Sequence, residues 1–136
     1  MSDPKKKILV CGVFDCFHAG HVQLLEGASR FGEVTVAIAD DVSIRVEKGE
    51  GRPKMPAEQR LQILLACKYV AFAKIFAFDD DPYLAHRDLV DRIKPDAYAE
   101  GRDHNNLYIY PVLEDYGIPR LIVPGNLQST TNILEK

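Results

Sequence analysis

The sequence lacks the features of a membrane-spanning or disulfide-stapled protein. Its apolar run 8–14 is too short to cross a bilayer, and no cleavage site of small residues follows a suitable apolar segment. It has 3 cysteines, an odd number that fits no disulfide framework. These absences predict a soluble protein with no membrane association, located in the reducing cytoplasm.

Net charge is also small, at −3, so the chain lacks the broad basic surface that binds nucleic acid. The hydrophobic share of 46% and the charged share of 27% are ordinary for a globular domain. A chain of 136 residues can bury a core of its own. We therefore expect a single domain, 1–136, with no room for a separate substrate lobe.

What the sequence does contain is a regular alternation of apolar patterns. Short apolar runs predict strands at 8–13, 33–39, 74–78, 97–99 and 121–123. Helical spacing, with start and stop residues, predicts helices at 19–31, 56–69, 82–94, 109–116 and 129–135. Residues 40–55 show no clean period and are expected to form a loop. The alternation predicts an α/β protein, a single Rossmann-like domain with a five-stranded parallel sheet and helices on both faces.

Two histidines stand at the end of the first predicted strand, where ligands bind in such sheets. In His18-Ala19-Gly20-His21 the imidazoles are three residues apart at a helix N-terminus, and Gly20 permits close approach of a ligand. This arrangement is suited to phosphate, although the dinucleotide fingerprint G-x-G-x-x-G is absent. The histidines could instead be ordinary surface residues, or could bind a metal with Cys16 and the nearby Cys11.

Basic side chains gather in the segment after the second predicted strand: Arg45, Lys48, Arg52, Lys54 and, on the following helix, Arg60. A mobile cation here can close over a triphosphate and neutralise developing charge. The alternative is that this segment is a solvated charged loop. Arg60 fits this alternative least well, because it lies on a predicted helix with an apolar stripe.

Three further strand ends hold polar residues. Ser129, Thr130 and Thr131 open the last predicted helix and could bind an anion or act as a plain cap. Gly101-Arg102-Asp103-His104 could contact a nucleotide or form a simple turn. The run 79–81 is explained in part by a helix cap, so we assign no metal there, and His86 is interpreted as a surface helix residue.

Together these segments resemble the cytidylyltransferase-like nucleotidyltransferases. The resemblance rests on H-x-G-H at 18–21 after Gly12, Phe14 and Asp15, and on S-T-T at 129–131. Between them, 48–53 and 58–60 are similar to the K-G-x-x-R-P and E-Q-R segments of heptose-1-phosphate adenylyltransferase domains. The resemblance spans residues 8 to 134, nearly the whole chain.

The resemblance implies transfer of a nucleotidyl group from a nucleoside triphosphate to a phosphorylated small molecule. His18, His21 and Lys48 would be catalytic, and Mg²⁺ would accompany the triphosphate. The remaining nucleotide-binding positions would be Gly12, Val13, Phe14, Gly20, Arg60, Gly101, Asp103, Ser129, Thr130 and Thr131, with Arg60 and 129–131 on the β- and γ-phosphates. Acceptor-binding positions would be Asp15, Asp40, Lys48 and Arg52. A homodimer is also implied, and the segment 107–116 is a candidate contact.

The nucleotide is expected to be ATP rather than CTP. Glycerol-3-phosphate cytidylyltransferases carry R-T-E-G-I-S-T-T before the last helix and a tryptophan after a G-D-D turn. Here the matching segment, 124–131, lacks the arginine, and the chain has no tryptophan. These departures favour ATP, as in the heptose-phosphate and archaeal FAD-synthetase relatives. A cytidylyltransferase for a polyol or amino-alcohol phosphate, and a nucleotide-binding module without turnover, remain the alternatives.

Overall fold

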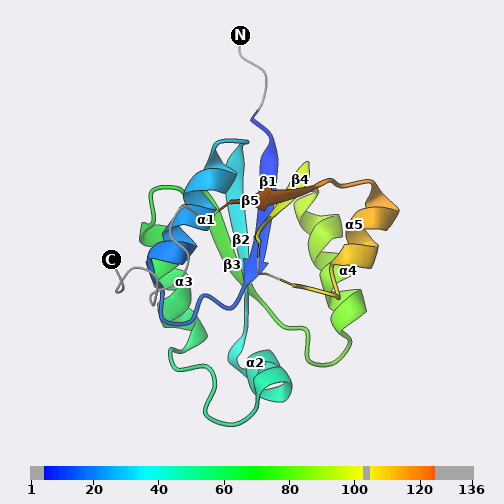
Figure 1. Cartoon of the computed structure of the whole chain (residues 1–136). Helices are drawn as coiled ribbons and strands as arrows, with labels where there is room; N and C mark the ends of the chain where they lie inside the picture. The colour runs from blue at the N-terminus through cyan, green and yellow to red at the C-terminus, as the bar shows by residue number, and fades with distance from the viewer. Residues whose placement is uncertain (1–4, 103–104, 125–136) are drawn as a thin grey trace.

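The strand β1 (Lys7–Gly12) lies at the centre of the sheet (Figure 1). The computed structural model describes residues 5–102 and 105–124. Its strands are ordered β3-β2-β1-β4-β5 and all pair in parallel. The other strands are β2 (Glu33–Ala39), β3 (Phe72–Phe76), β4 (Ala97–Gly101) and β5 (Arg120–Val123). The prediction of one α/β domain with a five-stranded parallel sheet is therefore confirmed.

Helices cover both faces of the sheet (Figure 1). On one face, α1 (Ala19–Ser29) and α3 (Ala57–Ala66) pack Leu25 and Leu64 against Val10 and Val36. On the other, α4 (Pro82–Ile93) and α5 (Tyr110–Tyr116) close over the opposite side chains of β1 and β4. Burial on both faces explains why β1 and β2 appear in the sequence as nearly continuous apolar runs.

The strand order places a topological switch point beside β1. The chain runs from β1 to β2 and β3 on one side, then returns to place β4 and β5 on the other. Crevices in such sheets open beyond the carboxyl ends of the strands at this point. The segments that follow β1, β2 and β3 therefore define the region in which a ligand site is expected.

The segment 40–55 differs from the expected loop. It contains the helix α2 (Asp41–Lys48), which lies beyond the end of β2 at the bottom of Figure 1. Asp40 caps it, because its side chain accepts the N–H of Ser43. Only Ser43 and Ile44 of this short helix are buried, and its apolar residues Val42, Ile44 and Val46 alternate along the sequence, a spacing typical of a strand rather than of a helix. The predicted helix at 129–135 lies outside the described residues.

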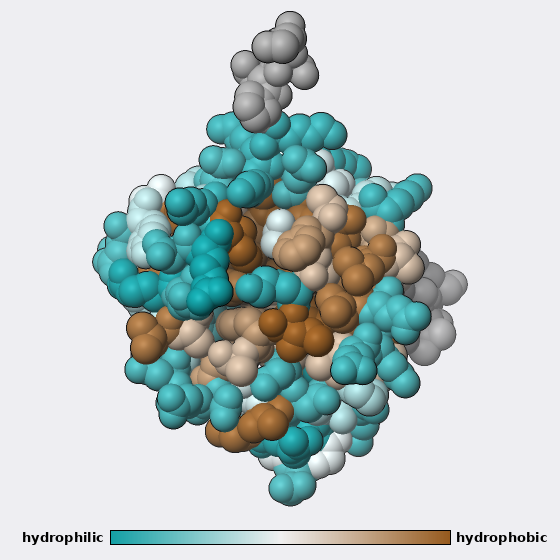
Figure 2. All heavy atoms as spheres, turned by 180° about the vertical axis from the view of Figure 1, so that it is seen from behind, coloured by the Kyte–Doolittle hydropathy of each residue, from teal (hydrophilic) through white to brown (hydrophobic). Residues whose placement is uncertain are grey.

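Apolar residues also reach the surface. Figure 2 shows the face behind that of Figure 1, where they gather in the middle and polar residues surround them. Within the segment 107–116, Leu107 and Tyr116 are exposed while Val112 and Leu113 pack on the sheet. The homodimer stays a prediction. Among the described residues, no helix is both long and apolar enough to cross a membrane.

Candidate active site

Two hollows open at the carboxyl ends of the strands and share Cys11, Gly12, Val13 and Lys48. The histidine pocket, of about 300 Å³, adds Phe14, Asp15, His21, Leu24 and Arg52. The aromatic pocket, of about 350 Å³, adds the rings of Phe76, Phe78, Tyr83, His86 and Tyr108 beside Glu47, Asn105 and Asn106. The end of β1 and Lys48 thus line both hollows, which form two halves of one crevice.

The two histidines cap α1 reciprocally. Nδ1 of His18 accepts the N–H of Gly20 at 3.0 Å, and Nδ1 of His21 accepts the N–H of His18 at 3.1 Å. A nitrogen that accepts a hydrogen bond carries no proton, so each neutral ring has its proton on Nε2. The backbone N–H groups of residues 18 and 20 are thereby used, and the donors that the motif offers to an anion are the Nε2–H groups.

His21 is held in its neutral form. Burial, together with the neighbouring His18, lowers the pKa of His21 from 6.5 to about 4. Its ring stacks on that of His18 at a centroid distance of 3.9 Å and also contacts Phe14 and Phe17. His21 therefore presents an oriented neutral donor rather than a positive charge.

Gly20 is required by the fold of this turn as much as by a ligand. A Cβ atom at this position would lie 2.9 Å from Cε1 and 3.1 Å from Nδ1 of His18. Any side chain there would push the imidazole away from the backbone N–H group that it accepts. The glycine thus permits the capping geometry that orients His18.

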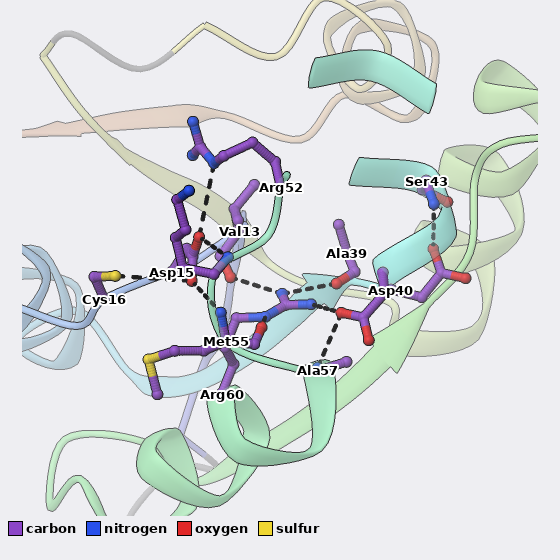
Figure 3. Close-up of polar contacts among 12 residues, drawn as sticks. Val13, Asp15, Cys16, Ala39, Asp40, Ser43, Arg52, Met55, Ala57 and Arg60 are labelled. Carbon is purple, nitrogen blue, oxygen red and sulfur yellow. Dashed lines mark hydrogen bonds and ion pairs between the residues drawn. The ribbon is translucent and has the colours of Figure 1, made fainter. Parts of the chain in front are cut away.

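Asp15, expected to bind the acceptor, lines the histidine pocket and also ties two loops together (Figure 3). Its carboxylate accepts the N–H groups of Lys54 and Met55 at 2.7 and 2.9 Å and lies 3.8 Å from Nε of Arg52. Burial acts to raise the pKa of Asp15, but these N–H groups and the nearby arginines outweigh it and lower the pKa. Phe14 and Cys16 on either side have positive φ values of 53° and 55°, a strained backbone typical of functional turns.

Arg60, expected on the β- and γ-phosphates, is fully buried in the structure (Figure 3). Its guanidinium donates to the carbonyl oxygens of Met55, Val13 and Ala39 and to the carboxylate of Asp41, over 2.7–2.9 Å. The side chain lines neither pocket. The described geometry thus places Arg60 as a link between the ends of β1 and β2 and the start of α3.

The remaining predicted residues divide into four groups. Gly12, Val13, Phe14 and Lys48 line the crevice, and Arg52 is half-exposed at its edge. Asp40 caps α2, and its role as an acceptor ligand stays a prediction. Gly101 ends β4 and is half-buried. Asp103, His104 and residues 129–131 lie outside the described residues.

A metal site built on the histidines is not formed. Within residues 5–102 and 105–124, no three His, Cys, Asp or Glu side chains come together to hold a metal ion. The thiol of Cys16 is directed toward Asp15, and burial raises the pKa of the Cys11 thiol well above its usual range. Cys11 therefore supplies no thiolate to this site.

The interpretation of His86 as a surface residue is wrong. It is buried, with Nδ1 at 2.7 Å from the carbonyl of Pro82 and Nε2 at 3.3 Å from the amide nitrogen of Asn106. The rings that surround it come from β3, from the segment just after β3 and from the segment after β4. In the sequence, its spacing of three and four residues from Leu89 and Val90 places it on the buried stripe of α4, and this is the signal that could have found it. Phe78, Tyr83, Tyr108 and Glu47 were likewise not selected as site residues, and only the aromatic content after β3 could have pointed to them.

The fold and the position of the crevice define a class: doubly wound α/β domains with a ligand site at the carboxyl end of the first strand. Within that class, the chain belongs to the cytidylyltransferase-like family, whose model matches residues 9–115. This membership agrees with the resemblance drawn from the two motifs.

Two curated relatives are informative. The bifunctional protein HldE of Desulfatibacillum aliphaticivorans is 32% identical over 135 residues, which is 96% of this chain and 27% of that protein. The FAD synthase of Pyrococcus horikoshii is 41% identical over 106 residues, 76% of this chain and 68% of that protein. The chain thus spans about a quarter of the length of its HldE relatives.

Solved structures agree on the fold. A lipopolysaccharide core biosynthesis protein from Thermoplasma volcanium superposes with a TM-score of 0.72 at 25% identity, covering 92% of this chain and 99% of that one. Pantoate-beta-alanine ligase from Francisella tularensis reaches a TM-score of 0.62 at 16% identity, over 90% of this chain and 60% of that one. At 16% identity, the similarity to the Francisella ligase shows a shared fold and nothing about function.

Proposed function

We propose that the chain transfers a nucleotidyl group, AMP from ATP in preference, to a small phosphorylated acceptor such as a sugar phosphate, and releases pyrophosphate. The observation that carries this proposal is the stacked pair of imidazoles at the end of β1, with protons on Nε2. Membership of the cytidylyltransferase-like family supports it.

The proposed reaction needs alignment more than acid–base chemistry. An oxygen of the acceptor phosphate attacks the α-phosphorus, and the bond from that phosphorus to the oxygen bridging to the β-phosphate breaks. The electron pair leaves with pyrophosphate. Because the acceptor phosphate is already an anion at neutral pH, no general base is required.

His18 and His21 would donate Nε2–H bonds to the triphosphate, where negative charge develops on the leaving group. Lys48, which lines both pockets, would lie between the α-phosphate and the acceptor phosphate. Mg²⁺ would arrive with the nucleotide and neutralise part of the phosphate charge. The described residues hold no cluster of metal ligands, so its ligands would be phosphate oxygens.

The positions of the other predicted site residues suggest roles for them as well. Asp15, Asp40 and Arg60 would act as positioning residues, because each bonds the backbone of the loops around the crevice. Arg52 would reach the phosphates from its half-exposed position. Gly101, Asp103 and residues 129–131 would contact the nucleotide, as in the family motif.

The preference for ATP rests on two observations. The chain has no tryptophan, and 124–131 lacks the arginine of the cytidylyltransferase signature. In addition, FAD, the product named for the Pyrococcus relative, contains an adenylyl group. CTP is retained as the alternative substrate.

The test is a pyrophosphate-release screen of ATP, CTP, GTP and UTP against a panel of phosphorylated acceptors. We expect release that depends on the acceptor, is highest with ATP, and is lost in Lys48→Ala. A nucleotide-binding module without turnover would instead bind the triphosphate, form no product and tolerate Lys48→Ala. Binding without product across the panel would contradict the proposed function.

A further inference from the structure

The aromatic pocket is a built cavity next to the proposed reaction site. Its walls come from the ends of β1, β2 and β3, from α2 and α4, and from residues 105–108. It meets the histidine pocket at Lys48 and at the end of β1. A phosphate held beside Lys48 would therefore place the group it esterifies in the aromatic pocket.

The aromatic wall has no pair of parallel ring faces between which a flat ligand could lie. The centroids of adjacent rings among Phe76, Phe78, Tyr83, His86 and Tyr108 are 5.1–6.2 Å apart, and the rings are inclined to one another by 34–90°. A flat fused ring system is gripped best between parallel faces, which these rings do not offer. The C–H face of a saturated ring can pack on such inclined aromatic surfaces.

His86 contributes no positive charge to this wall. The Pro82 carbonyl can only accept, so Nδ1 of His86 carries the proton, and Nε2 accepts from Asn106. Burial lowers the pKa of His86, although the Pro82 carbonyl and Glu47 act in the opposite direction. The ring is therefore a neutral part of the wall.

The aromatic pocket has one positively and one negatively charged side chain. Of the described residues that line it, Lys48 is the one cation and Glu47 the one anion. The charge of Glu47, followed by its hydrogen bond to the Tyr108 hydroxyl, raises the pKa of Tyr108. With Asn105 and Asn106, these groups suit hydroxyls, which can donate to the carboxylate and accept from the amides. A second phosphate or carboxylate on the acceptor would meet Glu47 without a cation of its own.

Resting on the proposed function, we propose that the aromatic pocket binds the non-phosphate part of the acceptor and takes an uncharged, hydroxyl-bearing ring. Glu47 sets the selection against acceptors that carry a second anionic group. The volume of about 350 Å³ lies at the small end of the range for small-molecule sites and fits one such ring.

The experiment compares glucose 1-phosphate with glucose 1,6-bisphosphate, which differ only in the second phosphate, and includes FMN as a flat aromatic phosphate. Turnover is measured by pyrophosphate release, and binding by ³¹P NMR titration. We expect the wild-type protein to favour the monophosphate at least tenfold over the bisphosphate and over FMN. In Glu47→Lys that ratio falls at least tenfold, while the KM for ATP changes less than twofold.

Two further variants sharpen the result. Glu50→Lys makes the same charge change on an exposed residue outside both pockets and should leave the ratio unchanged. Tyr108→Phe removes the hydroxyl that bonds Glu47 but leaves the carboxylate's charge in place, and should therefore keep the discrimination. A ratio that is the same in Glu47→Lys and wild type, a preference for FMN, or binding of neither sugar phosphate overturns the inference. Failure of the proposed function is distinct, because sugar phosphate would then bind with no acceptor-dependent release.

Discussion

Arg60 offers the sharpest separation between a phosphate-binding residue and one that holds the crevice together. Replacing it by Met keeps a long side chain of similar reach but removes every donor. The carbonyl oxygen of Ala39 loses a buried hydrogen bond, those of Val13 and Met55 each lose a part-buried one, and Asp41 loses its ion pair. These four acceptors belong to segments far apart in the sequence, so the loss affects the whole end of the sheet.

The magnitude follows from the partners. Each carbonyl left without a donor costs roughly 1 kcal/mol, which gives about 3 kcal/mol for three. Asp41 adds little, because its side chain is 35% exposed and still accepts the N–H of Ala57. The total agrees with the lower end of the roughly 3–5 kcal/mol measured when one partner of a buried ion pair is removed.

Urea unfolding followed by circular dichroism measures this loss. Arg30→Met is the matched control, because Arg30 forms an exposed ion pair with Glu26 on α1. We expect its free energy of unfolding to change by less than about 0.5 kcal/mol. An Arg60→Met variant with wild-type stability and a KM for ATP raised tenfold would refute the positioning role and restore the expected phosphate contact.

Three further predictions concern the histidine pair. His18→Ala or His21→Ala should each lower kcat about 10²- to 10³-fold in a pyrophosphate-release assay while the protein stays folded, since each removes one oriented donor; near-wild-type turnover in both would rule the assignment out. Gly20→Ala should also reduce kcat, because the new Cβ would lie 2.9 Å from the His18 ring and would displace it. Full activity of this variant would show that catalysis does not depend on the observed position of the His18 ring. Because the pKa of His21 is lowered from 6.5 to about 4, its contribution to stability is complete above about pH 6.5 and is lost as the pH falls toward 4. The Tm should therefore drop less between pH 7 and pH 5 in His21→Gln than in wild type, and equal drops would count against a neutral His21.

Much of the fold could be predicted because its strands are buried on both faces. β2 was predicted with its observed ends, 33–39, and β1 within one residue of its observed ends, since continuous apolar runs mark central parallel strands. The strand at 74–78 lies two residues earlier, at Phe72–Phe76, because edge strand β3 leaves Phe72 exposed and weakens the apolar signal there. The helix α2 was missed because its apolar residues alternate as in a strand rather than at helical spacing.

The site could be predicted only where its residues are adjacent in the chain. The 18–21 segment forms its reciprocal cap locally, so spacing alone located it. Asp15 and Arg60 could be selected from their motifs, but their hydrogen-bond partners lie up to 40 and 47 positions away and cannot be predicted from spacing. The aromatic pocket was missed for the same reason, because the rings around His86 come from other elements.

The most direct test of the central claim is the fate of two labels. The protein is incubated with acceptor and MgATP labelled with ³²P either at the α- or at the γ-phosphate, and products are separated by chromatography. Nucleotidyl transfer predicts that the α-label enters the acceptor product and the γ-label appears in pyrophosphate. A γ-label on the acceptor, or no label transferred from either position, would contradict the account.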